Sequence, residues 1–283
     1  MTLSHSLAGS LSPETRTILV TGSTDGIGKA AAKALARMGH RVLVHGKDPG
    51  RGRAVLREIR GETPGAAPDL FTADLSALEG VRGLAAEVGD RYDRLDVLVN
   101  NAGVYRAERV ITGDGLEVTF AVNLVAPFLL AHLLLPLLGA GAPARIVNVA
   151  SSAHFDARDT DWGRIRGGGE YRGWDAYALS KLGVVLLTYR MARELDPSRV
   201  TVNCLHPGVI CTKLLASAFP GYPCESPEEG ARTPVYLATS PEVEGVTGKY
   251  FDGMKDARSS RISRSPEAQD RLWGIVGGIA GFA

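Results

Sequence analysis

The sequence predicts one α/β domain, a Rossmann-type doubly wound parallel sheet of about seven strands with helices on both faces. Short runs rich in β-branched residues alternate with longer amphipathic or alanine-rich stretches, the order expected of parallel strands joined by crossover helices. The runs are apolar throughout, as strands are when helices cover both faces of their sheet. No shift in composition divides the 283 residues, so we expect a single domain over residues 16–283 after a flexible lead-in over residues 1–15.

The expected strands are short and are spaced widely enough for a helix to lie between them. They are Thr17–Thr21, Arg41–His45, Asp69–Thr72, Leu95–Asn100, Ala144–Ala150, Arg199–Leu205 and Lys249–Phe251. The expected helices are Gly28–Met38, Arg51–Arg60, Leu75–Val88, Leu116–Leu138 with a break or kink near Asn123, Asp175–Leu195 and Pro227–Thr239. Ligands bind such sheets at the carboxyl ends of the strands, so the residues that follow each strand are the candidates for a site.

Charge and hydropathy disfavour nucleic acid and membrane as partners. Lys and Arg number 32 against 31 Asp and Glu, so no overall field attracts a polyanion or an anionic lipid surface. The most apolar stretch, Leu124–Leu138, is shorter than a membrane span and contains Pro127 and Pro136, which predicts a buried helix. The first residues lack the basic start and apolar core of a signal peptide.

Cysteine usage bears on metals and on location. The three cysteines, Cys204, Cys211 and Cys224, lack paired spacing, which predicts neither a disulfide framework nor a zinc site. No metal is therefore expected. A reducing cytoplasm fits this cysteine usage best.

The first expected strand runs directly into a glycine turn and an alanine-rich helix, the context of a dinucleotide site. Gly22 permits the tight turn, Gly26 lets backbone approach a pyrophosphate, and Gly28 lets helix and strand pack closely. The N–H groups at the helix start favour the same anion. The residues expected to contact the cofactor here are Gly22, Ser23, Thr24, Asp25, Gly26, Ile27 and Gly28.

The end of the second expected strand distinguishes the two nicotinamide dinucleotides. An NAD enzyme usually carries there an acid that binds the ribose 2′-hydroxyl, whereas this chain reads His45-Gly46-Lys47. Lys47, helped by a hydroxyl of the glycine turn, is suited to neutralise a 2′-phosphate, so NADP(H) is favoured. Asp25 and Asp48 keep NAD(H) open as the less favoured alternative.

Tyr177 and Lys181 stand four positions apart in an expected helix, so both side chains project from the same face. A neighbouring ammonium favours phenolate, which lowers the pKa of a tyrosine toward the range of a general acid/base. On its own this spacing is usually an ordinary helix surface. Here it occurs with other polar motifs placed after strand ends, namely Asn100-Asn101-Ala102-Gly103 and Ile146–Ser152, and with Asn123 inside a helix.

These motifs follow the order typical of one family, and the chain resembles a short-chain dehydrogenase/reductase from Thr17 to about Phe251. The resemblance implies hydride transfer that interconverts a carbonyl and an alcohol, with Tyr177 as general acid/base. It implies that Lys181 lowers the pKa of the tyrosine and holds the nicotinamide ribose, and that Asn123 supports a water relay. Ser152 would hydrogen-bond the substrate oxygen, with Ser151 as the fallback.

The same resemblance assigns further contacts to the cofactor. It implies that Asp74 and Leu75 contact the adenine. It implies that Asn101, Ala102 and Gly103 contact the adenosine ribose. The residues implied on the nicotinamide side are Pro207, Gly208, Val209 and Thr212. Without it, Asp74 is the expected N-cap of the following helix, and the asparagines are loop residues.

Two segments break the alternation after strand ends and are the expected substrate loops, near residues 152–174 and 209–226. Ser152 and Tyr177 are 25 positions apart, more than in compact members of the family. This extension resembles the retinol-dehydrogenase-like and protochlorophyllide-reductase-like branch. The loop aromatics predict a small hydrophobic carbonyl or alcohol as substrate, or else anchor the loops in the core; they are Phe155, Trp162, Trp174, Phe219 and Tyr222.

Other interpretations stay open at this level. The same residues suit the reduction of a conjugated C=C bond, and a catalytically silent NADP(H)-binding regulator is the alternative outside enzymes. The apolar helix Leu124–Leu138, or the helix that carries Tyr177, suits a homodimer or homotetramer, although burial within one chain explains the same pattern. The Ser- and Arg-rich segment ARSSRISRS, residues 257–265, reads as a solvated loop.

Overall fold

The computed structural model describes residues 15–281, so the expected lead-in lies almost wholly outside the described residues. Eight strands form one sheet in the order β3-β2-β1-β4-β5-β6-β7-β8. Seven of them run parallel, and the last pairs antiparallel with its neighbour. The strands are β1 (Thr17–Val20), β2 (Arg41–Gly46), β3 (Asp69–Thr72), β4 (Val97–Asn100), β5 (Ala144–Val149), β6 (Val200–His206), β7 (Tyr250–Asp252) and β8 (Lys255–Ala257).

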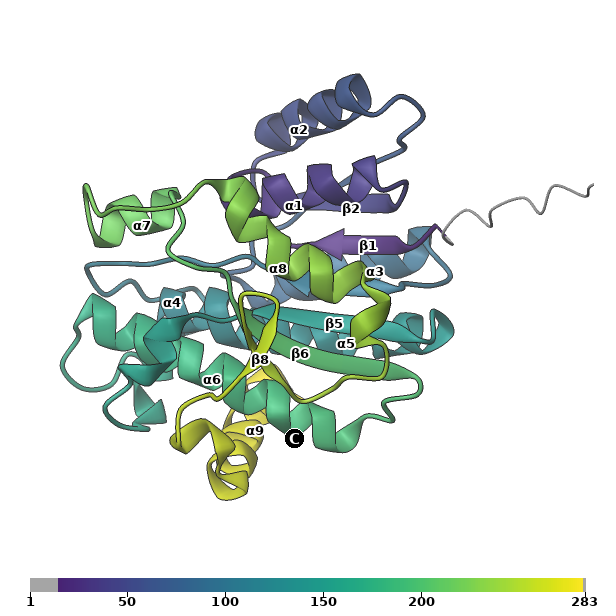
Figure 1. Ribbon diagram of the computed structural model, residues 1–283. Helices are drawn as coiled ribbons and strands as arrows, with labels where there is room; N and C mark the ends of the chain where they lie inside the picture. The colour runs from purple at the N-terminus through teal and green to yellow at the C-terminus, as the bar shows by residue number, and fades with distance from the viewer. Residues whose placement is uncertain (1–14, 282–283) are drawn as a thin grey trace, which may run out of the picture.

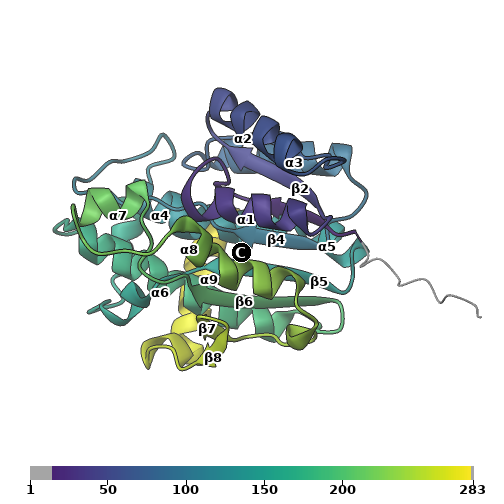
Figure 2. The same cartoon turned by 45° about the horizontal axis from the view of Figure 1, so that its top comes forward.

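Helices connect the strands and cover both faces of the sheet (Figures 1 and 2). The α-helices are α1 (Gly26–Arg37), α2 (Pro49–Glu62), α3 (Leu78–Arg91), α4 (Val118–Phe120), α5 (Ala126–Ala140), α6 (Gly173–Glu194), α7 (Lys213–Ala218), α8 (Pro227–Thr239) and α9 (Pro266–Ala280). A π-helical turn, η1 (Ala121–Val125), joins α4 to α5. The 3-10 turns are η2 (Ser152–Phe155), η3 (Trp162–Arg166), η4 (Pro241–Val243) and η5 (Ile262–Arg264).

The period of two in β1 divides its side chains between two cores. Leu19 packs in the core shared with α3, α5 and α6, whereas Ile18 and Val20 pack in the core shared with α1, α2 and α8. β1 is therefore apolar on both sides, as the sequence predicts. The strand order reverses between β1 and β4, and this switch point opens a crevice at the carboxyl ends of both strands.

The helix expected over Leu116–Leu138 forms two residues further along the chain, and its apolar part extends beyond the stretch Leu124–Leu138. The helical run Val118–Ala140 has 23 residues and is apolar enough to cross a membrane by length and composition, which corrects the expectation that it is too short. Its most apolar window is 78% buried inside the fold, so the buried helix is confirmed. Helix α9 packs on α6, with Trp273 against Phe128 of α5 (Figure 1). Burial within the chain is the alternative that the sequence analysis left open for Leu124–Leu138, and the homodimer or homotetramer stays a prediction.

The segment 257–265 is not a solvated loop, which corrects the sequence expectation. Ser259 and Ser263 are buried, and their hydroxyls lie 2.9 Å apart. The Tyr189 hydroxyl of α6 lies 2.7 Å from that of Ser259. Serine is a polar residue typical of solvated loops, but here Ser259 forms a buried hydrogen bond with Tyr189 of α6.

Candidate active site

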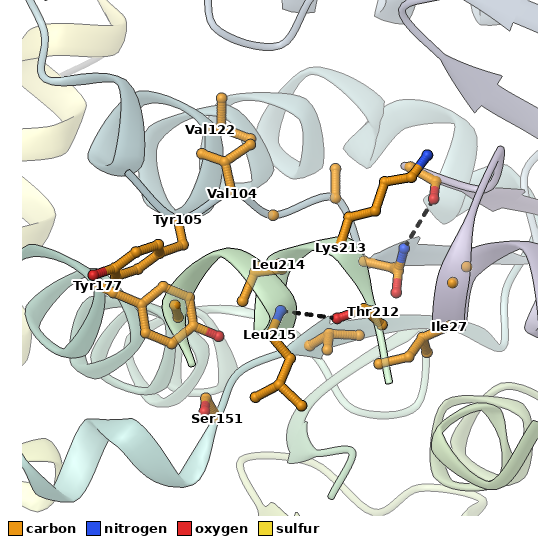
Figure 3. A pocket seen from close by; sticks show the side chains of 18 of the residues that line it. Ile27, Val104, Tyr105, Val122, Ser151, Tyr177, Thr212, Lys213, Leu214 and Leu215 are labelled. Carbon is orange, nitrogen blue, oxygen red and sulfur yellow. Dashed lines mark hydrogen bonds between the residues drawn. The ribbon is translucent and has the colours of Figure 1, made fainter. Parts of the chain in front are cut away.

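A cavity of about 880 Å³ lies at the carboxyl ends of the parallel strands. The glycine turn after β1 lines one part of it, and Tyr177 with Lys181 of α6 line another. Figure 3 shows Tyr105, Tyr177 and Ser151 on one side of this cavity and Ile27 with Thr212 on the other. The cavity thus joins the predicted cofactor and catalytic residues in one site.

Close backbone approach explains two glycines of the turn. Gly22 has φ +64°, and a Cβ there would stand 2.8 Å from the Cα of Ala102. A Cβ on Gly28 would stand 2.5 Å from the carbonyl oxygen of Gly22. The turn therefore packs directly on the start of α1 and on the segment after β4.

Two residues predicted to contact the cofactor instead hold the turn from behind. Ser23 is fully buried and lies outside the cavity lining; its hydroxyl donates to the carbonyl of Val20 at 2.8 Å and accepts the N–H of His45 at 2.9 Å. The Asn101 amide donates to the carbonyl of Thr21 at 2.8 Å, although this residue also lines the cavity. A side-chain contact from Ser23 to a 2′-phosphate is therefore ruled out by its burial.

His45 is a site residue that the sequence analysis did not assign. Its ring is 2% exposed; Nδ1 accepts the N–H of Gly22 at 3.1 Å, and Nε2 lies 3.2 Å from the carbonyl oxygen of Ala73, to which it donates. Burial lowers the pKa of His45 to about 4, opposed by the Ala73 carbonyl and the charge of Asp74. The neutral imidazole ties the glycine turn to the end of β3.

The charged side chains of Lys47, Asp48 and Asp25 differ in the partners that they have within the protein. Lys47 is exposed and lines the cavity. Asp48 caps α2, accepting the N–H groups of Gly50 and Arg51 at 2.7 and 3.0 Å. Asp25 pairs with Arg51 at 2.7 Å and with Lys213 of α7 at 2.9 Å; the hydrogen bond from Lys213 holds its pKa below the usual range, against partial burial.

The other predicted cofactor contacts lie at the cavity wall. They are Thr24, Gly26, Ile27, Asp74, Leu75, Ala102, Gly103, Pro207, Gly208, Val209 and Thr212. Asp74 is not the N-cap of a helix, because α3 begins only at Leu78. Its carboxylate accepts the N–H and hydroxyl of Ser76 at 2.9 and 2.8 Å, and these bonds keep its pKa low although burial opposes them.

Tyr177, Lys181 and Ser151 converge at the catalytic end. Complete burial raises the pKa of Tyr177 to about 12, opposed by a hydrogen bond from the Ser151 side chain. The Lys181 ammonium lies 5.7 Å from the centroid of the Tyr177 ring and donates to the carbonyl of Val149 at 2.8 Å. Burial lowers the pKa of Lys181 to about 8. Desolvation dominates the pKa of Tyr177 in the protein alone, and the lowering by the lysine stays a prediction.

The structure places Ser151, rather than Ser152, against Tyr177. Ser151 caps η2, where its hydroxyl accepts the N–H of Ala153 at 3.2 Å. Ser152 also lines the cavity, but it is exposed and begins the 3-10 turn. Of the two serines, it is therefore the fallback, Ser151, whose side chain hydrogen-bonds Tyr177.

Asn123 stands in the π-helical turn, at the break that the sequence analysis expected. Its side chain is buried and outside the cavity lining. The Oδ1 atom accepts the N–H of Val104 at 2.8 Å, while Nδ2 donates to the carbonyl of Val104 at 3.0 Å and to the Ser180 hydroxyl at 3.1 Å. It fixes the segment after β4 against the helix that carries Tyr177.

Aromatic side chains form a connected series along the substrate part of the cavity. Tyr177 lies next to Tyr105 and Trp174, at ring-centroid distances of 6.3 and 5.7 Å. Trp174 continues to Phe219 at 5.1 Å, and Phe219 to Tyr222 at 6.1 Å. The other predicted aromatics lie elsewhere: Trp162 is buried in the core, and Phe155 packs on His154. Tyr105 was not predicted, because it lies in a segment without a recognisable motif.

A disulfide closes the segment that contains α7, which corrects the prediction from the cysteines. Cys211 and Cys224 are bonded across a sequence separation of 13, whereas Cys204 is buried and unbonded. Cys211 and Cys224 are far apart in the sequence, but the fold brings their Cα atoms to 5.1 Å from each other. The cytoplasmic location stays a prediction, now without support from the cysteine pattern.

Within residues 15–281, no three His, Cys, Asp or Glu side chains stand together as a metal site. The cavity is instead lined by a glycine turn, a lysine at the end of β2, and a buried tyrosine, serine and lysine. These features define a nicotinamide dinucleotide oxidoreductase of the Rossmann class.

The chain belongs to the short-chain dehydrogenase family, whose model matches residues 16–222. It is 38% identical to human Retinol dehydrogenase 13, over 94% of this chain and 85% of that protein. It is 39% identical to mouse Polyprenol dehydrogenase, over 91% of this chain and 82% of that protein. These relatives assign it to the retinol-dehydrogenase-like branch, as the extended loops predict.

Solved structures agree with this assignment. A putative uncharacterized protein from Mycobacterium paratuberculosis superposes with a TM-score of 0.78 at 27% identity, over 94% of both chains. A putative short-chain dehydrogenase from Shigella flexneri complexed with NADP gives a TM-score of 0.70 at 30% identity, over 86% of this chain and 98% of that one. The Rossmann fold expected from the sequence is confirmed, with one strand more than expected.

Proposed function

We propose that the protein is an NADP(H)-dependent oxidoreductase that interconverts a carbonyl and an alcohol on a small hydrophobic molecule. The observation that carries the proposal is the position of Tyr177, which stands beside Ser151 and Lys181 in the cavity that the glycine turn also lines. A buried acid next to a dinucleotide-binding turn suits proton transfer coupled to hydride transfer.

The cofactor fits the residues at the wall of the cavity. The turn would hold its pyrophosphate, because Gly22 and Gly26 both have positive φ, line the cavity and carry no side chain. When bound, the reduced nicotinamide supplies the hydride. Lys181 would hold the ribose next to it, and Pro207, Gly208, Val209 and Thr212 would line the nicotinamide side.

Tyr177 supplies the proton in the direction of reduction. With its pKa raised to about 12 by burial, the phenol stays protonated at neutral pH and can donate to a carbonyl oxygen. Ser151 hydrogen-bonds the same oxygen and orients it toward the phenol. Asn123 keeps the backbone after β4 in place beside Lys181. Donation leaves Tyr177 as the phenolate, and in the reverse direction this phenolate accepts the proton of the alcohol.

The preference for NADP(H) is supported by the engagement of both nearby carboxylates. The Oδ1 atom of Asp48 is bound to backbone N–H groups and Asp25 pairs with two cations, so both carboxylates already have partners within the protein. Lys47 at the cavity suits a 2′-phosphate. We expect Lys47→Ala to weaken NADPH binding about 10- to 100-fold, the loss of one charge-assisted contact, and to leave NADH binding nearly unchanged. Fluorescence titration measures both; an equal loss for the two cofactors would contradict the preference.

The aromatic series beside Tyr177 supports an apolar substrate, because rings bind apolar ligands through large contact areas. The relatives named retinol and polyprenol dehydrogenases point in the same direction. We therefore propose a hydrophobic aldehyde, ketone or alcohol as substrate.

The direct test follows NADPH absorbance while the protein meets aliphatic, aromatic and polycyclic carbonyls, with NADH in parallel. Carbonyl-dependent NADPH oxidation that is lost in Tyr177→Phe supports the proposal. Turnover of enones alone, with the C=C bond reduced, replaces it with conjugated double-bond reduction. Tight NADPH binding without turnover of any substrate replaces it with a nucleotide-binding regulator.

A further inference from the structure

His154 lies directly behind the serine of the site and is used by none of the chemistry above. Its ring is 1% exposed, with Nδ1 at 2.7 Å from the carbonyl oxygen of Ser151. A carbonyl oxygen only accepts, so Nδ1 carries the hydrogen and donates it. Nε2 is then the acceptor, and it receives the backbone N–H of Ser260 at 3.1 Å. Both ring nitrogens are therefore committed to backbone atoms of two distant segments.

The second segment is anchored on the helix that carries the catalytic pair. The Ser259 hydroxyl lies 2.7 Å from the Tyr189 hydroxyl of α6 and 2.9 Å from that of Ser263. Ser259 and Ser263 are both buried, so these bonds are shielded from water. The chain segment 258–263 is in this way fixed to α6 twelve residues beyond Tyr177.

These contacts close a ring of interactions that begins and ends on α6. From Tyr177 the ring passes through the Ser151 side chain, the Ser151 carbonyl and the His154 imidazole. It returns through Ser260 and Ser259 to Tyr189. A serine hydroxyl is placed by its own backbone, so a bond to the Ser151 carbonyl restrains the direction of the hydroxyl.

We propose that His154 is a positioning residue, which holds the Ser151 carbonyl so that the Ser151 hydroxyl stays hydrogen-bonded to Tyr177. Through its bond to Ser260, His154 also makes this geometry depend on segment 258–263. The proposal rests on the proposed function, in which Ser151 and Tyr177 act on the substrate oxygen. The ring of His154 also packs on Phe155 and Tyr250, with centroids at 4.0 and 4.8 Å, so packing is the competing explanation.

Two replacements of His154 separate hydrogen bonding from packing. His154→Phe keeps an aromatic ring against Tyr250 and removes both hydrogen bonds. His154→Asn loses the ring, but its amide nitrogen takes nearly the place of Nδ1 and can donate to Ser151. Ser260→Ala is the matched control, because it keeps the backbone N–H that His154 accepts.

The full-length protein is assayed with NADPH and the best carbonyl of the panel, with kcat, KM and the NADPH dissociation constant measured separately. We expect His154→Phe to lower kcat about 10- to 100-fold, the effect of a small misplacement of a catalytic group, without changing NADPH affinity. His154→Asn recovers only part of kcat, because it restores the bond to the Ser151 carbonyl but not the one to Ser260, and Ser260→Ala resembles the wild type. A wild-type kcat in His154→Phe, or a larger loss in His154→Asn than in His154→Phe, would overturn the proposal.

Amide hydrogen exchange gives a second readout that needs no turnover. In His154→Phe we expect faster exchange in residues 150–155 and 258–263 together, with the sheet unchanged. Faster exchange in neither segment, or in only one of them, overturns the coupling. If the wild type reduces no carbonyl, the proposed function fails, and the exchange data still decide whether His154 holds the two segments together.

Discussion

At the scale of single residues, the environment of Tyr177 decides which protonation state meets the substrate. The phenol is buried, the Ser151 side chain hydrogen-bonds it, and the Lys181 ammonium lies 5.7 Å from the ring centroid. Desolvation outweighs the hydrogen bond, so the neutral phenol prevails. The residue is thus an acid in the protein alone, and any lowering of its pKa has to come from what binds beside it.

The two neighbouring serines differ in their expected effect on catalysis. We expect Ser151→Ala to lower kcat about 100- to 1000-fold, the loss of a hydrogen-bond donor to the reacting oxygen. Ser152→Ala, at the exposed start of η2, keeps a kcat close to that of the wild type. Steady-state kinetics with NADPH measure both. The reverse order of the two variants would return the catalytic role to Ser152.

His45 predicts a pH dependence of stability. Its pKa falls from 6.5 in the unfolded chain to about 4 in the fold, so the unfolded state binds more protons between these values. Its contribution is present in full above pH 6.5 and is lost as the pH falls toward 4, by about 3 kcal/mol. Urea unfolding at several pH values measures it, with His45→Gln as the control that cannot titrate. Parallel pH curves for the two proteins would show that His45 does not set this slope.

Residue motifs predict which positions belong to the site better than which way the side chains point. Ser23 and Asn123 stand where the family pattern expects them, yet both side chains bind backbone atoms behind the cavity. The direction is set by carbonyl and N–H groups from segments far away in the chain, which a local pattern does not contain. His45 was missed for the same reason.

At the scale of elements, α7 is the part of the site that depends most on contacts outside its own helix. It has six residues and no buried ones, too short to persist as an isolated helix. Two links hold it: the Cys211–Cys224 disulfide closes its segment, and Lys213 pairs with Asp25 of the glycine turn. Leu214 and Leu215 of α7 line the cavity, so these links shape the substrate side.

Replacing Cys211 and Cys224 together by serine is expected to lower the free energy of unfolding by up to about 3 kcal/mol, through the added freedom of the unfolded chain. The same double variant is expected to raise KM for the carbonyl more than KM for NADPH, because the segment carries Phe219 and Tyr222. Denaturant titration and kinetics measure the two effects. Dithiothreitol should shift the wild type in the same way and leave the double variant unchanged; no response of the wild type would contradict the role given to the bond.

The sequence analysis missed helix α9 and strand β8, which are stabilised by contacts with other elements of the fold. Strands β1 to β7 and six helices were predicted because each carries its own apolar pattern; the helices are α1, α2, α3, α5, α6 and α8. Helix α9 contains Gly274, Gly277 and Gly278, which weaken its intrinsic helix propensity, and packing on α6 compensates. Strand β8 exists only as the partner of β7.

At the scale of the whole molecule, α9 joins parts of the chain that are far apart in sequence. Arg190 and Arg193 of α6 both pair with Asp270, and Arg82 of α3 donates to the carbonyl of Ala280. Leu272 is completely buried between these contacts. The last helix therefore completes one of the two cores rather than lying on a finished domain.

A large-to-small change in α9 tests this role. We expect Leu272→Ala to lower the free energy of unfolding by about 2 to 5 kcal/mol, the usual cost of a buried leucine. Gly274→Ala is the matched control on the same helix, because it is exposed and a Cβ there meets nothing within 4 Å. It should instead stabilise the protein by about 0.4 to 1 kcal/mol. Equal, small effects of the two changes would show that α9 is peripheral to stability.

The antiparallel strand β8 has a consequence for how the molecule behaves at high concentration. A parallel sheet that ended at β7 would present a row of unpaired N–H and C=O groups, a template on which another chain can assemble. β8 pairs with that edge and is itself only three residues long, with Lys255 and Asp256 exposed and Asp256 paired to Lys249 at 3.0 Å. A short, charged last strand blocks edge-to-edge growth, so this side of the molecule is protected against aggregation.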